Sequence, residues 1–136
     1  MKQFFFIVFI SLFFFVSGTK GQAVTVTNPT NVNPAMAANY GSLSAAITAL
    51  NLVTTVTGPV IITLNTGFPQ TAPAGGYTIN FTGATSAANN ITIEGSNNII
   101  TAFNPQTSGL LTDAIFKLVG VDYITIQHFT MQEING

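Results

Sequence analysis

Short bursts of alternating apolar and polar residues recur along the chain from residue 22 onward. A period of two residues is typical of β-strands that bury one face. Turn-forming residues separate the bursts, for example at 95–98 and 120–122. The pattern predicts strands at 24–27, 60–64, 77–81, 90–94, 99–103, 115–119, 123–127 and 129–131.

One segment has the helical period instead. Over residues 42–50 the apolar positions follow the spacing i, i+3, i+4, i+7, which places them on one helical face, and Gly41 or Ser42 can serve as the N-cap. A helix of two turns is unstable by itself, so we expect it to dock on the strands. The apolar positions are Leu43, Ala46, Ile47 and Leu50.

The strand pattern repeats along the chain. The strand at 79–81 is followed by Gly83 and the strand at 91–93, and the strand at 116–118 by Gly120 and the strand at 124–126. The first strands of the two sets lie 37 residues apart and the second strands 33. Such a period predicts an all-β solenoid, a parallel β-helix whose coils stack on one another. A β-sandwich is the alternative fold, although tight two-residue hairpin turns are lacking.

The first residues have the layout of a secretory signal peptide. A basic start precedes an apolar core at 4–16 and a run of small residues, and we expect cleavage after Gly21 or Ala23, of which Gly21 sets the boundary used below. A membrane anchor is the weaker alternative, because 13 residues of helix span roughly 20 Å, less than the ~30 Å of a bilayer core. The signal peptide (1–21) predicts a secreted or outer-surface location without a stable membrane span after cleavage.

The remainder divides into two parts. Residues 22–39, rich in Thr, Asn, Pro and Ala, are expected to form a flexible lead-in. Residues 40–136 are expected to form the N-terminal cap and first coils of the β-helix, with the helix at 42–50 covering one end. Because nothing comparable follows the last strand, we expect a chain truncated at its C-terminus. For 22–136 alone we expect aggregation or a partly molten state, because strand edges are exposed.

The composition of the chain excludes several classes of function. Charged residues make up 5% of the chain, against roughly 25% in ordinary soluble domains, and there is no Arg and no Cys. A nucleic-acid-binding face needs clustered cations, so this class of partner is excluded. The absence of Cys excludes disulfides, thiolate metal sites and a cysteine nucleophile.

The segment from Tyr40 to Asn51 resembles the Tyr-x-Ser/Thr-Leu-x-x-Ala opening of large secreted surface proteins from Bacteroidetes. Residues 57–64, 71–76 and 116–126 are similar to the segments that follow in that family. The resemblance implies a right-handed parallel β-helix of the pectin-lyase-like kind, exported by type IX secretion. Such proteins usually end in a C-terminal sorting domain, which these residues do not include. The resemblance implies a fold and an export route, but no reaction.

The candidate chemistry is sparse. Polysaccharide lyases of this shape use a basic residue beside carboxylate-bound calcium. Beyond the signal peptide the chain holds one base, Lys117, which the strand pattern turns outward. The four acids are spread along 40 residues, so a pair that meets across stacked coils to hold calcium is a minor alternative. These acids are Glu94, Asp113, Asp122 and Glu133.

The other polar candidates have ordinary structural interpretations. His128 has no second His or Cys with which to bind a metal, so we expect it at the surface. The triplets at 80–82 and 90–92 match the glycosylation pattern by chance in an Asn- and Thr-rich chain. Asn89–Asn90 and Asn97–Asn98 are expected in turns. We therefore assign no catalytic, cofactor-binding or metal-binding residue and no cofactor.

Two classes of function remain. The preferred one is a non-catalytic surface scaffold for adhesion or glycan binding, which presents polar rows and Tyr40, Tyr77 or Tyr123 to extracellular glycans or cell surfaces. The alternative is the first part of a carbohydrate-active enzyme, a lyase or hydrolase, whose active site lies downstream of residue 136. Downstream coils of the same chain are the expected intramolecular partner. Ice binding, suggested by the Thr-x-Thr motif at 25–27, is a third hypothesis without a repeated array in the sequence.

Overall fold

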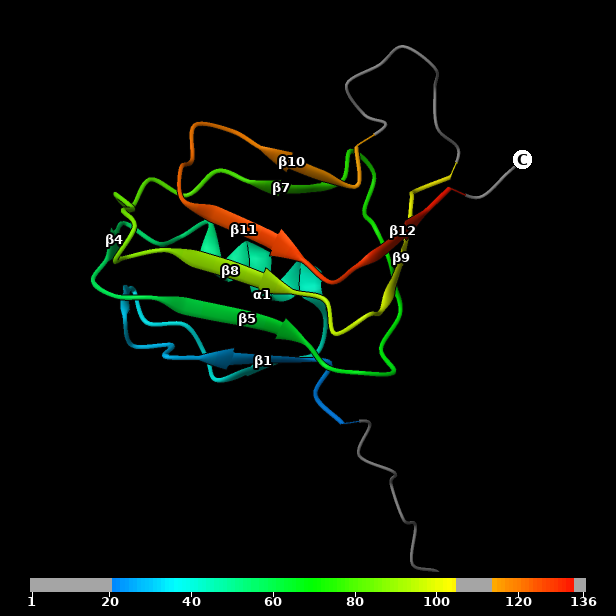
Figure 1. Ribbon diagram of the computed structural model, residues 1–136, viewed down its shortest axis with the longest axis horizontal. Coiled ribbons are helices and arrows are strands. Elements are labelled where there is room, and N and C mark those ends of the chain that lie inside the picture. Colours follow the sequence, from blue (N-terminus) through cyan, green and yellow to red (C-terminus); the bar gives the residue numbers. More distant parts are fainter. Residues whose placement is uncertain (1–20, 105–113, 134–136) are drawn as a thin grey trace, which may run out of the picture.

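The computed structural model describes residues 21–104 and 114–133. Strands dominate these residues and one short helix accompanies them, which confirms the all-β expectation (Figure 1). The expected signal peptide lies almost wholly outside the described residues. Within the described ranges, no helix is long and apolar enough to cross a membrane.

The largest sheet mixes parallel and antiparallel strands. Its order is β11-β8-β5-β1-β3, with β5, β8 and β11 parallel to one another, whereas β1 pairs antiparallel with both β5 and β3 (Figure 1). The five strands are β1 (Val24–Thr27), β3 (Asn39–Tyr40), β5 (Val60–Leu64), β8 (Ile91–Glu94) and β11 (Ile124–Gln127).

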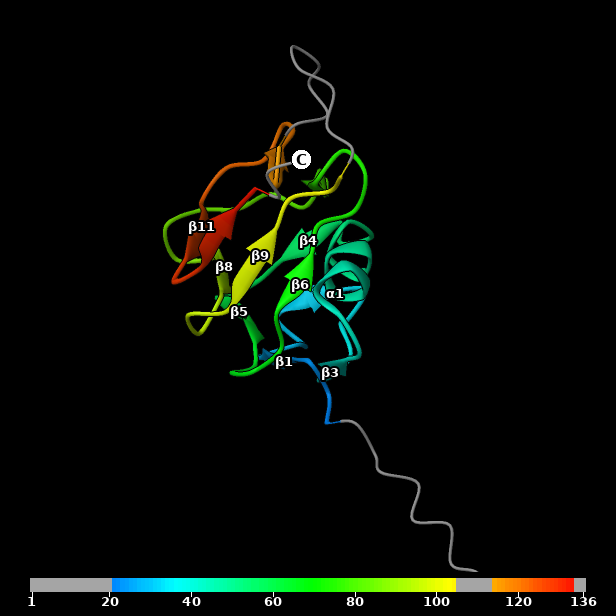
Figure 2. The same ribbon diagram turned by 90° about the vertical axis from the view of Figure 1, so that its right-hand side faces the viewer.

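Two smaller sheets are parallel throughout, and a further pair is antiparallel. One parallel sheet has the order β12-β9-β6, and the other pairs β10 with β7. Figure 2 shows β6 and β9 between the largest sheet on one side and the helix on the other. The bounds are β6 (Gln70–Thr71), β9 (Ile99–Thr101), β12 (Thr130–Gln132), β7 (Tyr77–Ile79), β10 (Phe116–Leu118), and, in the antiparallel pair, β2 (Val32–Asn33) and β4 (Thr55–Val56).

The chain enters the three sheets in a repeating order. It runs through β5, β6 and β7, then β8, β9 and β10, and then β11 and β12, so that each strand pairs in parallel with its counterpart from the preceding round. In the largest sheet Val60 pairs with Ile91, and Ile91 with Ile124. The second of these steps is the 33-residue spacing read from the sequence, and it is confirmed.

The 37-residue spacing is wrong by two residues. Phe116 pairs with Tyr77 rather than with Ile79, an offset of 39 residues, and the rings of Phe116 and Tyr77 lie 5.3 Å apart. Tyr77 and Ile79 are both buried. A shift of two residues keeps the same strand face inward, so the apolar pattern cannot distinguish the two registers.

The core is a stack of inward-facing aliphatic side chains from successive strands of the largest sheet. Val60, Ile62, Ile91 and Ile93 have no exposed surface. The alternation that predicted each strand also selects these residues, since neighbours in the sequence point to opposite faces. Side chains of the same kind therefore lie against one another from strand to strand.

Helix α1 (Leu43–Leu50) begins and ends as the sequence predicts. Ser42 is the N-cap, and its Oγ accepts a hydrogen bond from the Ala45 N–H at 3.1 Å. The apolar face of α1 is buried as expected, and the helix lies behind the largest sheet in Figure 1 and contacts β3 and β7. The buried residues are Leu43, Ala46, Ile47 and Leu50.

Asn51, which follows α1, pairs with the free edge of β7. Its Nδ2 donates to the Thr78 carbonyl at 2.8 Å, and its Oδ1 accepts from the Asn80 N–H at 2.9 Å. One side-chain amide thus satisfies a donor and an acceptor that a neighbouring strand would otherwise pair.

Residues 22–39 differ from the expected flexible lead-in. They contain β1, which pairs along its whole length with β5, and Val24 is fully buried. The Val-Thr alternation of β1 supplies one apolar face, as in the later strands. The Pro- and Asn-rich composition that suggested a lead-in describes the turns between β1, β2 and β3, not a segment separate from the fold.

A disulfide between neighbouring strands tests the parallel register. Thr92 and Thr125 are paired residues on the outward face of β8 and β11. In-register Cα atoms of adjacent strands lie about 5 Å apart, within the disulfide range. We expect Thr92→Cys with Thr125→Cys to oxidise almost completely, as measured by thiol titration in a chain that has no other Cys.

The matched control combines Thr92→Cys with Gln127→Cys. This diagonal pair is two residues out of register, about 8 Å apart, which is too far for an unstrained disulfide. Faster or more complete oxidation of the control pair than of the in-register pair would contradict the register.

Candidate functional site

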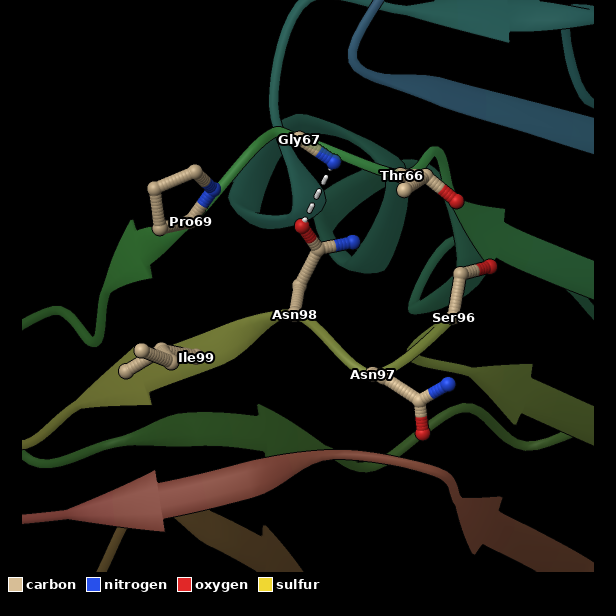
Figure 3. Close-up of a pocket in the computed structure, with 7 residues that line it drawn as sticks. All are labelled: Thr66, Gly67, Pro69, Ser96, Asn97, Asn98 and Ile99. Atoms are coloured by element: carbon tan, nitrogen blue, oxygen red, sulfur yellow. Dashed lines mark hydrogen bonds between the residues drawn. The ribbon is translucent and has the colours of Figure 1, made fainter.

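A surface groove lies between two turns that stack at one corner of the molecule. The upper turn in Figure 3 joins β5 to β6, and the lower turn joins β8 to β9. The groove has a volume of about 400 Å³. Its lining residues are Thr66, Gly67, Pro69, Ser96, Asn97, Asn98 and Ile99.

Asn98 holds the two turns together. It is 6% exposed, and its Oδ1 accepts from the N–H of Gly67 at 3.1 Å (Figure 3) and from the N–H of Phe68 at 2.9 Å. The Nδ2 of the same amide lies 2.8–3.1 Å from three carbonyl oxygens, one at the end of β5, one in the β5–β6 turn and one in its own turn, which share its two hydrogens. The buried amide therefore contacts five backbone groups, so that both walls of the groove are fixed. The three carbonyls belong to Leu64, Asn65 and Gly95.

The backbone of the lower turn has an unusual conformation. Ser96 and Asn97 have φ values of 48° and 60°, which non-glycine residues seldom adopt. The turn between β11 and β12 supports this turn, because the Asn97 N–H donates to the His128 carbonyl at 2.7 Å. At Gly95 a Cβ atom would lie 2.5 Å from the same carbonyl oxygen, so the close approach of the two turns requires glycine there.

A carboxylate and a histidine meet beside the groove. The Nδ1 of His128 lies 2.8 Å from the Oε2 of Glu94, which also accepts from Gln127 at 2.9 Å. The other carboxylate oxygen accepts from the Ser96 N–H at 2.8 Å. Desolvation acts to raise the pKa of the Glu94 carboxyl, but these hydrogen bonds and the His128 charge lower it to about 2.

The remaining candidate residues of the sequence do not join this cluster. Lys117 is exposed on β10, in register with Thr78 of β7. Asp122 is exposed, and its backbone carbonyl accepts from the Thr85 hydroxyl at 2.8 Å. Glu133 is exposed after β12, and Asp113 lies outside the described residues. Among the residues that the structure describes, no three His, Asp or Glu side chains are arranged to hold a metal ion.

The expectation that Tyr77 is presented at the surface is wrong. Tyr77 is 2% exposed and packs on Phe116, and burial raises the pKa of its hydroxyl to about 12. Tyr77 and Ile79 lie two residues apart on β7, so both side chains point to the buried face of the strand. Tyr40 is half-buried and its hydroxyl accepts from the Ala37 N–H at 2.8 Å, whereas Tyr123 is 55% exposed.

The outward face of the largest sheet gathers threonines that lie far apart in the sequence. The strand register aligns two rows across four strands, so the motif at 25–27 does not stand alone in the structure. Both rows are interrupted by other residue types, which makes the face mixed rather than a uniform threonine array. The rows are Thr27, Ile61, Thr92 and Thr125, and Thr25, Thr63, Glu94 and Gln127.

Sequence reasoning missed the contact between Glu94 and His128 and the role of Asn98. The 33-residue spacing places Glu94 opposite Gln127, one residue before His128. The repeat in the sequence could therefore have predicted the contact between Glu94 and His128. Asn97 has the left-handed backbone expected of a turn, but the Asn98 side chain reaches across to the β5–β6 turn. No local pattern distinguishes these two neighbouring asparagines.

Comparison with protein-family models, with curated proteins and with solved structures finds no match to this chain. The function must therefore be argued from the groove and its surroundings.

Replacing Asn98 tests its role in joining the two turns. Asn98→Asp keeps the acceptor for Gly67 and Phe68 but removes the donor and places a carboxylate against three carbonyl oxygens. We expect the free energy of unfolding to fall by about 3 kcal/mol or more, measured by denaturant titration. The matched control is Asn97→Asp, because Asn97 is exposed and aspartate tolerates its backbone conformation. Equal loss in the two variants would contradict the assignment.

The Glu94 cluster predicts a pH dependence of stability. The folded-state pKa of about 2 lies below the ordinary 4.5, so this carboxylate stabilises the fold above pH 4.5. That contribution is lost as the pH falls from 4.5 toward 2. Glu94→Gln should lower the free energy of unfolding at neutral pH and flatten its decline in this window. Glu133→Gln, which removes an exposed carboxylate after β12, is the control. A decline unchanged by Glu94→Gln would rule out the cluster as its source.

Proposed function

We propose that the chain forms the N-terminal part of a right-handed parallel β-helix and acts as a non-catalytic, secreted or cell-surface scaffold that binds glycans. The observation that carries the proposal is the repeated order of the parallel strands, β5-β6-β7, β8-β9-β10 and β11-β12. Each round is one coil. Right-handed winding is the expected hand for parallel strands joined by crossovers.

The end of the stack formed by β1 and β3 has the features of a cap. Strand β1 runs antiparallel to β5 and ends the parallel series, and the edge strand beyond it, β3, is two residues long. Asn51 occupies the free edge of β7. Short or covered edges prevent another chain from adding to a sheet. These features support a first coil that begins the stack rather than continuing one.

The other end of the stack, formed by β10, β11 and β12, exposes apolar side chains and unpaired strand edges. Ile124 and Ile126 of β11 are partly exposed, whereas their counterparts Ile91 and Ile93 one coil below have no exposed surface. Leu118 on β10 and Met131 on β12 are 49% and 51% exposed. A further coil in the same register would bury these side chains and pair the free strand edges. We therefore propose downstream coils of the same chain as the partner of this end.

Glycan binding is supported by the polar but weakly charged exterior. Threonine, serine, asparagine and glutamine side chains match the alternating donors and acceptors of sugar hydroxyl groups. The start of the chain supports export, since residues 1–21 have the layout of a signal peptide. The family resemblance at 40–51 supports a Bacteroidetes surface protein exported by type IX secretion.

A glycan array tests the proposal. The full chain, labelled at its C-terminus, should bind a subset of immobilised oligosaccharides saturably, and free saccharide of the same kind should compete. Absence of saturable binding across neutral and acidic glycans would contradict a glycan-binding scaffold. Release of unsaturated or hydrolysed products from any polysaccharide would instead favour the alternative, a carbohydrate-active enzyme.

A further inference from the structure

We infer that the groove between the β5–β6 and β8–β9 turns is the glycan site and that its ligand is a neutral pyranose sugar rather than a uronic acid. The inference rests on the proposed function and specifies where the sugar binds and which class of sugar it is.

The lining of the groove matches the two kinds of surface on a pyranose ring. In Figure 3 the hydroxyl groups of Thr66 and Ser96 lie toward one end and the side chains of Pro69 and Ile99 toward the other. Ile99 is 39% exposed, so its side chain is available to a ligand in the groove. The apolar side chains can contact the C–H face of a sugar, and the hydroxyl groups can hydrogen-bond to its rim.

The charges at the groove favour a neutral sugar over an acidic one. The lining residues carry no cation that could pair with a uronate carboxylate. The Glu94 carboxylate, which accepts from the N–H of the lining residue Ser96, is the acidic group next to the groove and is paired with His128. A uronate would therefore meet a carboxylate and no lining cation, whereas a neutral sugar needs no counter-charge.

The groove is also formed in advance of binding. The Asn98 amide fixes both walls, and the next coil holds the strained turn at Ser96 and Asn97. Rigid walls lower the entropic cost of binding, and strained backbone tends to occur at ligand sites. The volume of about 400 Å³ falls within the ~300–1,000 Å³ of small-ligand sites.

The threonine rows of the largest sheet are the rival surface. They offer hydroxyl groups on Thr27 and Thr125, but they belong to the outward face of one sheet and are not among the residues that line the groove. Ile61 gives this face an exposed apolar side chain as well, so the two surfaces differ in shape rather than in the kinds of side chain they offer. The rival surface nevertheless supplies a matched control, because the same change can be made there.

The experiment compares two double variants of the full chain. Thr66→Val with Ser96→Gly removes both hydroxyl groups from the groove, and glycine accepts the positive φ at 96. Thr27→Val with Thr125→Val removes two hydroxyl groups from the rival face. The probes are neutral cello- and xylo-oligosaccharides and oligogalacturonate, titrated by calorimetry after circular dichroism has shown that each variant is folded.

We expect the groove variant to bind the neutral probe about tenfold or more weakly and the rival-face variant to bind it as the unchanged chain does. Tighter binding of oligogalacturonate than of neutral probes would overturn the ligand class. Loss of binding in the rival-face variant, with the groove variant unaffected, would overturn the location while leaving glycan binding intact. Failure of the unchanged chain to bind either neutral probe would overturn the inference, whereas the proposed function falls only if the glycan array also shows no saturable binding.

Discussion

The fold depends on the in-register stacking of aliphatic side chains between successive parallel strands. Val60, Ile91 and Ile124 form one such column, and each member is held in place by the backbone ladder of its sheet. Burial of each side chain requires the neighbouring strand to be in register, so apolar packing and backbone pairing reinforce each other. The exposure of this column follows from the pairing. Its side chains are fully buried on β5 and β8 and half-buried on β11, the edge strand, which has a described neighbour on one side only.

Asparagine amides satisfy the backbone where strand pairing stops. Asn51 pairs with the edge of β7, and Asn98 contacts five backbone groups where the β5–β6 and β8–β9 turns meet. An amide carries both donor and acceptor, so it can replace a peptide group without introducing charge. In a chain this poor in charged residues, such amides pair with the backbone groups that strand pairing leaves open. The same corner amide gives the groove its fixed shape, so that the stability of the fold and the proposed site share one residue.

Strand pairing brings one carboxylate and one histidine together. Glu94 on β8 contacts His128, which follows β11, and the carboxylate also accepts from Gln127 and from the Ser96 N–H. Parallel pairing in register places residues of like position next to one another, and here the carboxylate on one strand meets donors, not another acid, on the next. Among the described residues, the only acidic group that contacts a lining residue of the groove is thus already paired, and no cation lines the groove, which is the basis of the preference for neutral sugars that we infer.

Local patterns in the sequence determined the elements, and the tertiary structure determined their partners. The helix after Ser42 and the longer strands were predictable within about two residues, because period, caps and turn residues act over short distances. The two-residue strands β2, β3, β4 and β6 are too short to show a period. The pairing of β1 with β5 and the contact between Glu94 and His128 depend on which strand lies alongside. Partner choice is set by the length of chain between strands, and registers that differ by two residues bury the same face, so it was decided only when the strands packed together.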